Sequence, residues 1–505
     1  MKKRVVDVLE KALKEYGAEI SKQEIEQLIE SPPSVDLGDY SFPCFFLSKK
    51  FREKPHFIAL DIRKNIGTPP QTDFQDVQVE GGYINFFLNR KSLAQKVIFE
   101  IISKRKKYGT KRTFPGFRKK VIVEFSSPNI AKPFGIGHLR STIIGNAIAN
   151  ISETQGYKPI KINYLGDWGT QFGKLIYGFK RWGKLENLEK DPIKYLEKIY
   201  VTVNKNPEFE EPSRKWFKKL EAGEHEAVVL WRTFKELSIE EFKKIYKILG
   251  IKFDFVSGES KYAAKSQKIV DELKQKGILK KSQEALIIDL KKYNLGIVLI
   301  QKKDGTTLYM TRDIAAAIRR YKKHKFEKMV YQVGSEQALH FQQLFKILEL
   351  LDYEWSKKCF HSPHGLYLDK DGKKFSTRKG KTVYIEDLIN ETKKAAKEEI
   401  TKRNPKIKKQ ILEEKAHKVA LAAIFYGDLK NTKNNNIVFD PKKFVSFEGD
   451  TGPYIQYSYA RASSILRKSK NRSKVKLPEE LEKKEIELVK KLSEYPKVLE
   501  KASHT

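Results

Sequence analysis

The 505-residue chain is too long for one hydrophobic core, and its length suggests roughly three or four domains. Hydrophobic residues make up 40% of it, which excludes wholesale disorder, and its longest apolar runs, YINFFL at 83–88 and LGIVLI at 295–300, are too short to span a membrane. Lys and Arg total 100 against 64 Asp and Glu, a formal charge of +36, which favours a polyanionic partner such as nucleic acid or else a lysine-rich solvated surface.

The N-terminus predicts an amphipathic helix and not a signal peptide, because apolar residues recur at helical spacing while Asp7, Glu10 and Lys14 interrupt any apolar segment. The two cysteines, Cys44 and Cys359, cannot form a four-ligand zinc site alone and give no disulfide framework. We therefore expect a cytoplasmic protein with no metal site of its own.

Residues 1–115 predict a separate α/β unit that ends in a basic linker at 104–120. Its expected elements are helices near 2–16, 21–30 and 55–66, a hairpin over 74–88 and a helix at 90–107.

From residue 121 strands and helices alternate, which is typical of a parallel sheet. A polar, mostly helical insertion at 183–232 interrupts this alternation, and everything beyond about 386 reads as helical. The expected strands are 121–125, 159–164, 252–256, 285–290, 296–301 and 328–333, and the expected helices are 138–154, 170–181, 312–322 and 338–351.

Two segments carry chemistry. In FSSPNIAKPFGIGHLRST (125–142) a strand turns into a helix, whose N-terminal N–H groups suit phosphate; Gly135 and Gly137 allow close approach, and Lys132 and His138 add donors. Without a GxxxxGK[ST] pattern a P-loop is excluded, and the glycines alone would also fit a packed turn. The second segment, GKKFSTRKGKT (372–382), could neutralise a polyphosphate or form a solvated basic hairpin.

Together these segments resemble the HIGH and KMSKS motifs of class I aminoacyl-tRNA synthetases, here Gly135-Ile136-Gly137-His138 and Lys374-Phe375-Ser376-Thr377-Arg378. Longer runs narrow the resemblance to the arginyl-tRNA synthetase family, and they extend from the N-terminal unit almost to the last residue. These runs are SSPNIAKPF…GHLRSTIIGN (126–146), NYLGDWGTQFGKLI (163–176), SGES (257–260), LYMTRDIAAAIRRY (308–321), FSTRKGKTVYIEDLI (375–389) and SFEGDTGPYIQYSYAR (446–461).

The resemblance implies an α/β fold: a Rossmann-like parallel-sheet catalytic domain, an α/β N-terminal domain and an incomplete all-helical C-terminal domain. The implied domains are 1–115, which would contact the tRNA elbow, 116–385 for catalysis with its insertion at about 183–232, 386–445 as a helical connection and 446–505 as a partial anticodon-binding domain. A monomer is the family default.

The implied reaction has two steps and needs no enzyme nucleophile. The carboxylate of L-arginine attacks the α-phosphorus of ATP, bound with Mg²⁺, to give arginyl-adenylate and pyrophosphate. The terminal 2′-OH of tRNA(Arg) then attacks the acyl carbonyl. Such chemistry depends mainly on positioning and charge stabilisation.

The resemblance assigns ATP binding to Lys132, to Gly135, Ile136, Gly137 and His138, and to Lys374, Phe375, Ser376, Thr377 and Arg378; among these Lys132, His138, Lys374, Ser376 and Arg378 are the expected catalytic residues. Thr377 stands where many class I enzymes have a second lysine, and Lys132 matches a lysine thought to replace it. Gly135 stands where the first histidine of HIGH is usual, and removing one such donor costs about 10²–10³ in rate.

The substrate's guanidinium suits carboxylates. By resemblance Glu259, Asp313 and Tyr309 bind it, while Asn129 and Gln337 hold the amino-acid backbone; without the family, Asp313 reads as a helix N-terminal charge and Glu259 as a loop acid. Tyr454, Tyr457 and Arg461 suit unstacked RNA bases, or helix packing.

Three functions compete on these residues. Arginine–tRNA ligation leads, because Lys132, His138, Glu259 and Asp313 are present. A non-catalytic RNA-binding relative is favoured by Gly135 and by an end at 505 that falls within the expected anticodon domain. A class I synthetase or adenylyl-transfer enzyme for another substrate is disfavoured, because a neutral side chain would leave both acids buried and unpaired.

Overall fold

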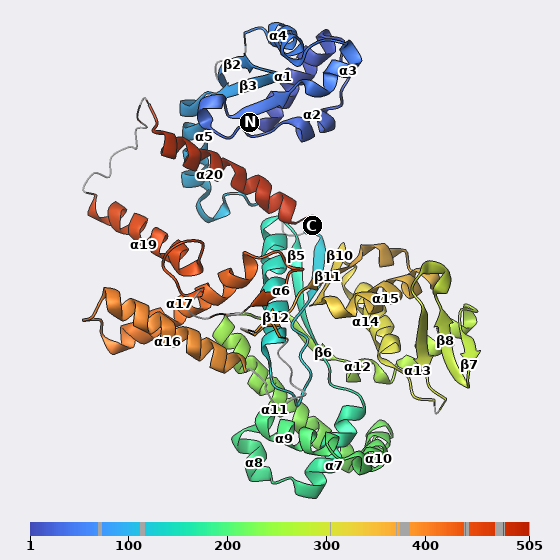
Figure 1. Ribbon diagram of the computed structural model, residues 1–505. Coiled ribbons are helices and arrows are strands. Elements are labelled where there is room, and N and C mark those ends of the chain that lie inside the picture. Colours follow the sequence, from blue (N-terminus) through green and yellow to red (C-terminus); the bar gives the residue numbers. More distant parts are fainter. Residues whose placement is uncertain are drawn as a thin grey trace. The chain divides into compact units, whose positions relative to one another are not determined.

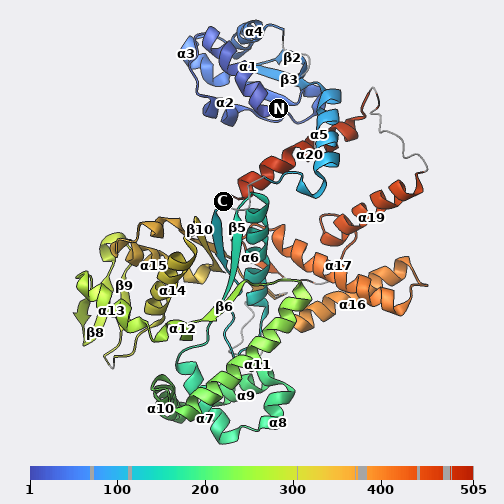
Figure 2. The same cartoon turned by 180° about the vertical axis from the view of Figure 1, so that it is seen from behind.

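The computed structural model describes residues 1–68, 73–111, 117–303, 305–369, 371–373, 384–438, 440, 444–469, 478 and 480–503 (Figures 1 and 2). The chain divides into two compact units. One comprises Met1–Lys111 with Asn471–Thr505, and the other comprises Arg112–Lys470.

The first unit is a three-stranded antiparallel sheet with strand order β1-β3-β2, covered by helices. Val5, Leu9 and Leu13 of α1 lie one helical turn apart and are fully buried, as the predicted amphipathic helix requires. The C-terminal helix packs against α5 in this unit. The elements are α1 (Lys2–Glu15), α2 (Lys22–Leu28), β1 (Tyr40–Pro43), α3 (Ser48–Phe51), α4 (Pro55–Ile66), β2 (Phe74–Glu80), β3 (Tyr83–Leu88), α5 (Arg90–Lys104) and α20 (Lys483–Ala502).

The second unit is built on a five-stranded, all-parallel sheet with strand order β11-β10-β4-β5-β6. Val121 and Val123 of β4 face one hydrophobic core with α6 and α11, whereas Ile122 faces a second core with α14 and α15. Both faces are therefore covered, which explains why the VIVEF strand is apolar throughout its first residues. The elements are β4 (Lys120–Glu124), α6 (Ile136–Thr154), β5 (Lys158–Leu165), β6 (Phe255–Gly258), α14 (Tyr309–His324), β10 (Lys328–Gly334), α15 (Ala338–Leu350) and β11 (Cys359–His364).

Further elements are inserted into or follow this sheet. A helical insertion lies between β5 and β6, a small antiparallel sheet lies between β6 and α14, and helices dominate after residue 384. They are α7 (Thr170–Trp182), α8 (Leu185–Lys190), α9 (Pro192–Asn204), α10 (Glu210–Glu221), α11 (His225–Leu249), α12 (Ser260–Ala263), α13 (Ser266–Gln275), β7 (Lys280–Ser282), β8 (Ala285–Asp289), β9 (Ile297–Gln301), β12 (Tyr367–Leu368), α16 (Ile385–Arg403), α17 (Lys409–Leu429), β13 (Ile437–Val438) and α19 (Gly452–Lys468).

The predicted parallel sheet is confirmed, with two differences. The strands expected at 285–290 and 296–301 pair with each other and with β7, antiparallel, and do not join the main sheet. In β9, Ile297 and Leu299 are exposed while Val298 and Ile300 are buried, an alternation typical of a sheet covered on one face. The fifth parallel strand is β11, which the sequence analysis did not predict. Among the described residues no helix has the length and apolar character that a bilayer crossing needs.

Candidate active site

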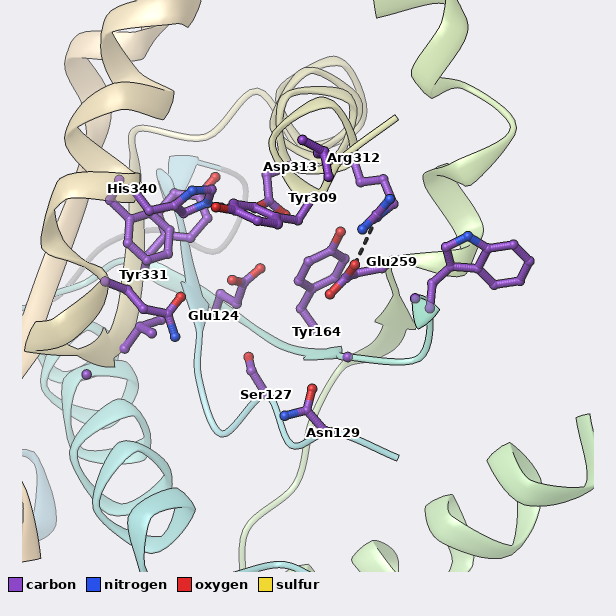
Figure 3. Close-up of a pocket in the computed structure, with 18 of the residues that line it drawn as sticks. Glu124, Ser127, Asn129, Tyr164, Glu259, Tyr309, Arg312, Asp313, Tyr331 and His340 are labelled. Carbon is purple, nitrogen blue, oxygen red and sulfur yellow. Dashed lines mark hydrogen bonds and ion pairs between the residues drawn. The ribbon is translucent and has the colours of Figure 1, made fainter. Parts of the chain in front are cut away.

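A cavity of about 840 Å³ opens at the carboxyl ends of the parallel strands (Figure 3). Its walls come from the residues that follow β4, β5, β6 and β10, together with the first turns of α6 and α14. Open parallel sheets bind their ligands at this edge. The cavity has the size of a small-molecule site.

The turn after β4 is strained and held in place by side chains from elsewhere in the unit. Ser126, Ser127 and Ala131 all have positive φ values, of 73°, 46° and 58°. The Ser126 N–H donates to Ser141 Oγ over 3.0 Å and the Ala131 N–H donates to Ser238 Oγ over 2.9 Å. Non-glycine residues adopt this conformation only where the surroundings enforce it, and such strain concentrates at functional sites.

Close backbone approach positions Asn129 in the cavity wall. A Cβ atom on Gly166 would lie 1.9 Å from Asn129 Oδ1, so any side chain here would force the Asn129 amide to move. The two residues also form an isolated parallel bridge. The bridge continues the pairing of β4 with β5 beyond the strand ends and directs the Asn129 amide to the cavity (Figure 3).

The start of α6 forms one end of the cavity. Gly135 is the N-cap, and its N–H donates to His138 Nδ1 over 3.3 Å. Burial, with the charges of Lys132 and His364, lowers the pKa of His138 to about 4, so the ring is neutral and its proton lies on Nε2. A neutral Nε2–H donor next to free helix N–H groups suits a phosphate oxygen.

Two acids lie on the opposite side of the cavity. Glu259 directly follows β6 and accepts a hydrogen bond from Arg312 Nε over 2.9 Å, and Asp313 accepts one from His340 Nε2 over 2.8 Å. Burial, with a smaller contribution from the nearby Asp313 charge, raises the pKa of Glu259 to about 7 against the opposing effect of Arg312. The arrangement places negative charge where a cationic side chain can bind.

A second layer holds Glu259 in place. The buried Asp167 carboxylate accepts hydrogen bonds from the Ser260 N–H over 2.8 Å and the Ser260 hydroxyl over 2.7 Å, and forms an ion pair with Lys235 at 2.6 Å. A Cβ atom on Gly258 would lie 2.3 Å from this carboxylate. The SGES motif is therefore a packed turn whose glycine and second serine both serve Asp167.

Glu124 is a third acid of the cavity, and the sequence analysis did not select it. It closes β4, is 4% exposed and forms an ion pair with the buried Arg320. Burial raises the pKa of Glu124 to about 7 against the charge of Arg320. The signal that could have identified it is a charged residue at the end of an otherwise apolar strand.

Several polar atoms of the cavity wall are unpaired among the described residues. The Tyr164 and Tyr331 hydroxyls, the Gln332 amide, Ser127 Oγ and His340 Nδ1 are buried and have no hydrogen-bond partner among the described residues. Buried polar groups are almost always paired in folded proteins. Their concentration around one cavity indicates a polar ligand there.

The structure brings seven of the predicted site residues together in one cavity. Asn129, Gly137, His138, Glu259, Tyr309, Asp313 and Gln337 line the cavity. Gly135 and Ile136 lie at the buried start of α6, and Lys132 lies in the turn before it with its Nζ 5.2 Å from the centroid of the Tyr200 ring. Tyr454, Tyr457 and Arg461 are exposed on α19 and do not line the cavity. The predicted Lys374, Phe375, Ser376, Thr377 and Arg378 lie outside the described residues.

Three family models match the chain. The catalytic domain of class I (R) tRNA synthetases matches residues 97–441, the N-terminal domain of arginyl tRNA synthetases matches residues 1–88, and the DALR anticodon binding domain matches residues 455–505. The first covers more than half of the chain.

Curated relatives and solved structures agree with these models. The arginine–tRNA ligase of Clostridioides difficile is 46% identical over 90% of this chain and 80% of its own length, and that of Halothermothrix orenii is 43% identical over 99% and 88%. The arginyl-tRNA synthetases of Thermus thermophilus and Plasmodium falciparum superpose with TM-scores of 0.76 and 0.75 at 24% identity; they cover 100% and 99% of this chain, and 88% of each is matched. These structures show the class I synthetase fold.

Proposed function

The chain belongs to the arginyl-tRNA synthetase family, and on this basis we propose that its cavity activates arginine with ATP and that its helical elements receive tRNA(Arg). The chain is a class I arginine–tRNA ligase. A non-catalytic RNA-binding relative is not favoured, because the curated relatives are ligases at about 45% identity.

The observation that carries the substrate assignment is the convergence of Glu124, Glu259 and Asp313 on one cavity. Carboxylates bind a guanidinium through charge-assisted hydrogen bonds, often as bidentate pairs. Arg312 and Arg320 already neutralise part of this charge, so the acids are not all available at once. With a neutral amino acid, Asp313 would keep the His340 ring as its hydrogen-bond partner but would gain no cation from the substrate.

The amino-acid backbone would be held by Asn129 and Gln337, which line the same cavity. In this position the substrate carboxylate points toward the start of α6. There the Nε2–H of neutral His138 and the open backbone at Gly137 receive the ATP phosphates, with Lys132 supplying positive charge. ATP enters with Mg²⁺ as a substrate.

Gly135 contributes to this site through its backbone. Its N–H donates to His138 Nδ1, and this bond fixes the tautomer and orientation of the ring. We propose that His138, oriented in this way, together with Lys132 supplies the charge stabilisation for which relatives use a first histidine. We also propose that Lys373, Lys374, Ser376 and Arg378 bind the phosphates, as the family resemblance implies.

The remaining parts of the chain would bind the tRNA that receives the arginyl group. We propose the division into 1–115, 116–385, 386–445 and 446–505, in which the N-terminal unit contacts the tRNA elbow and Tyr454, Tyr457 and Arg461 lie near the anticodon. These side chains are exposed on α19, so they are free to stack against unpaired bases.

The test is arginine-dependent ATP–pyrophosphate exchange with and without tRNA(Arg), and with lysine as the control amino acid. We expect exchange with arginine when tRNA(Arg) is added, and none with lysine. Absence of exchange in both conditions, with tRNA still retained in a filter-binding assay, would contradict the proposal and favour a binding protein. Gly135→His would then show whether the missing histidine is the cause.

A further inference from the structure

Helix α9 of the insertion contacts two residues that are far apart in sequence, Lys132 in the turn before α6 and Tyr384 at the N-cap of α16. Lys194, Glu197 and Tyr200 are spaced three residues apart and so share one face of this helix. Each of the three contacts a residue outside the insertion.

The first contact is with Lys132. Its Nζ lies 5.2 Å from the centroid of the Tyr200 ring, within the range of a cation–π interaction. The same ammonium is close enough to His138 to lower the pKa of that ring. The Lys132 ammonium therefore interacts both with the Tyr200 ring and with His138 at the start of α6.

The second contact is with Tyr384. Its hydroxyl donates to Glu197 Oε2 over 2.7 Å, and Lys194 Nζ lies 5.3 Å from its ring centroid. Tyr384 also forms an antiparallel bridge with Gly135, and the next residue, Ile385, donates its N–H to the Phe134 carbonyl over 3.4 Å. The backbone at 384–385 is thus fixed both to α9 and to the turn that begins α6.

The turn between β4 and α6 is also held by a residue of the same insertion, Ser238. Ala131, which has a φ of 58°, directly precedes Lys132, and its N–H is held by Ser238 of α11. A lysine side chain has several rotatable bonds and loses considerable freedom when it is fixed. A fixed backbone on one side and an aromatic ring on the other reduce that freedom before ATP binds.

We propose that Tyr200 is a positioning residue for the activation step: its ring holds the Lys132 ammonium in the place where it meets the ATP phosphates, and Glu197 aligns Tyr384 on the same helix face. This rests on the proposed role of Lys132 in arginine activation. Tyr200 does not touch the reacting atoms and acts through Lys132. The insertion thereby contributes to the chemistry as well as to the fold.

The test compares three variants in arginine-dependent ATP–pyrophosphate exchange with tRNA(Arg) present. Tyr200→Leu removes the ring face and should lower kcat/KM for ATP about 10- to 100-fold, since small displacements of a charged group cost rate steeply, while KM for arginine stays the same. Tyr200→Phe keeps the ring face and should restore the rate to within about twofold.

Tyr195→Leu is the matched control. It removes a ring from the same helix, but the Tyr195 hydroxyl bonds within the insertion, to the Trp182 carbonyl and the Lys184 N–H, so the exchange rate should change little. Circular dichroism melting of all variants checks that the insertion is folded. If Tyr200→Leu melts early, the less disruptive Tyr200→Met replaces it, with the same expected loss.

A second measurement isolates the route through Lys132. In a Lys132→Met background, Tyr200→Leu should cause no further loss, because the charge that the ring holds is gone. Equal rates for Tyr200→Leu, Tyr200→Phe and the unmodified chain, a faster rate for Tyr200→Leu, or additive losses with Lys132→Met would each overturn the proposal. Absence of exchange in the unmodified chain would instead contradict the proposed function, so the two failures are distinguishable.

Discussion

Glu259 can lose its charge and keep its shape in the variant Glu259→Gln. The amide still fills the turn after β6, but it no longer neutralises Arg312 or attracts a guanidinium. We expect KM for arginine to rise about 100-fold or more, because breaking a buried charge pair costs about 3–5 kcal/mol. KM for ATP should stay within about threefold. The exposed Glu354→Gln is the control, and an unchanged KM for arginine would contradict the assignment.

The acids also predict the pH dependence of arginine use. Burial raises the pKa of Glu124 and Glu259 to about 7, so both are increasingly protonated as the pH falls below 7. A protonated carboxyl has lost the charge that attracts a guanidinium, so kcat/KM for arginine should fall as pH drops from 8 to 6. The free energy of unfolding should instead rise as the pH drops from 8 to 6. The reason is that the folded chain binds more protons than the unfolded chain between the ordinary pKa of a glutamate and pH 7.

The pH profile of kcat/KM for arginine can also show whether these two acids, rather than other groups of the site, cause the decline. In Glu259→Gln the decline in kcat/KM between pH 8 and 6 should become shallower, because one titrating group is gone. KM for ATP measured at the same pH values corrects for general effects. A profile with the same slope in the variant would show that other groups govern the pH dependence.

Gly137, in the first turn of α6, has open space where a side chain would lie. An added Cβ would meet no atom within 4 Å, so Gly137→Ala should leave stability unchanged or raise it by about 0.5 kcal/mol. If ATP phosphates approach this backbone, the methyl group should raise KM for ATP about tenfold or more and leave KM for arginine unchanged. An unchanged KM for ATP in a folded variant would place the nucleotide elsewhere.

At the scale of elements, a buried charge pair joins α6 to α17. Arg140 lies about one turn from the start of α6, and its Nε is 3.6 Å from Asp428 Oδ2 of α17. The Tyr367 hydroxyl donates to the same carboxylate, and Arg140 donates to the Asn435 carbonyl. α6 and α17 are thus held by a charge pair that is 1% exposed on both sides.

Asp428→Asn should destabilise this unit by about 3 kcal/mol, because it leaves the Arg140 guanidinium buried without a carboxylate. The urea midpoint of the unit should fall, and the exchange rate should fall with it, since α6 carries His138. Glu414→Gln, an exposed pair on the same helix, should change stability by less than about 0.5 kcal/mol. Equal midpoints for both variants would contradict a structural role for the charge pair.

The elements differ in how well the sequence predicted them, because some carry a strong local pattern and others depend on long-range contacts. The apolar β4 strand and the glycine-containing turn after it have a strong local pattern, and the family resemblance then identified the acids that follow β6 and begin α14. β11 was missed because CFHSPH contains two histidines and a proline, and only its pairing with β10 makes it a strand. Tyr200 and Ser238 could not be predicted, because their contacts join residues that are 68 and 107 positions apart.

At the scale of the whole molecule, an amphipathic pattern identifies the buried face of a helix but not the element that covers it. The last helix, α20, illustrates this: the DALR match at 455–505 includes it with α19, yet α20 packs against α5 in the N-terminal unit. Val489 of α20 is buried in that unit's core. Helix partners are decided by long-range packing, which a local pattern does not contain.

Net charge is a property of the whole chain, and it predicts how tRNA binding responds to salt. With 100 basic and 64 acidic residues, the chain attracts the phosphates of tRNA, and binding releases the counterions condensed on them. Four phosphate contacts would already weaken binding about 100-fold when salt rises fourfold. Arginine, which binds buried carboxylates, should be affected far less, because buried pairs are poorly screened.

We therefore expect the Kd for tRNA(Arg), measured by filter binding between 50 and 200 mM KCl, to rise at least about 30-fold. KM for arginine, measured at saturating tRNA over the same range, should change less than about threefold. Comparing the salt dependence of the Kd for tRNA with that of KM for arginine separates long-range electrostatic attraction from short-range ion pairing. Neither measurement does so alone. A Kd for tRNA that hardly depends on salt would mean that the excess lysines lie on surfaces that tRNA does not touch, and that the charge reflects a solvated surface.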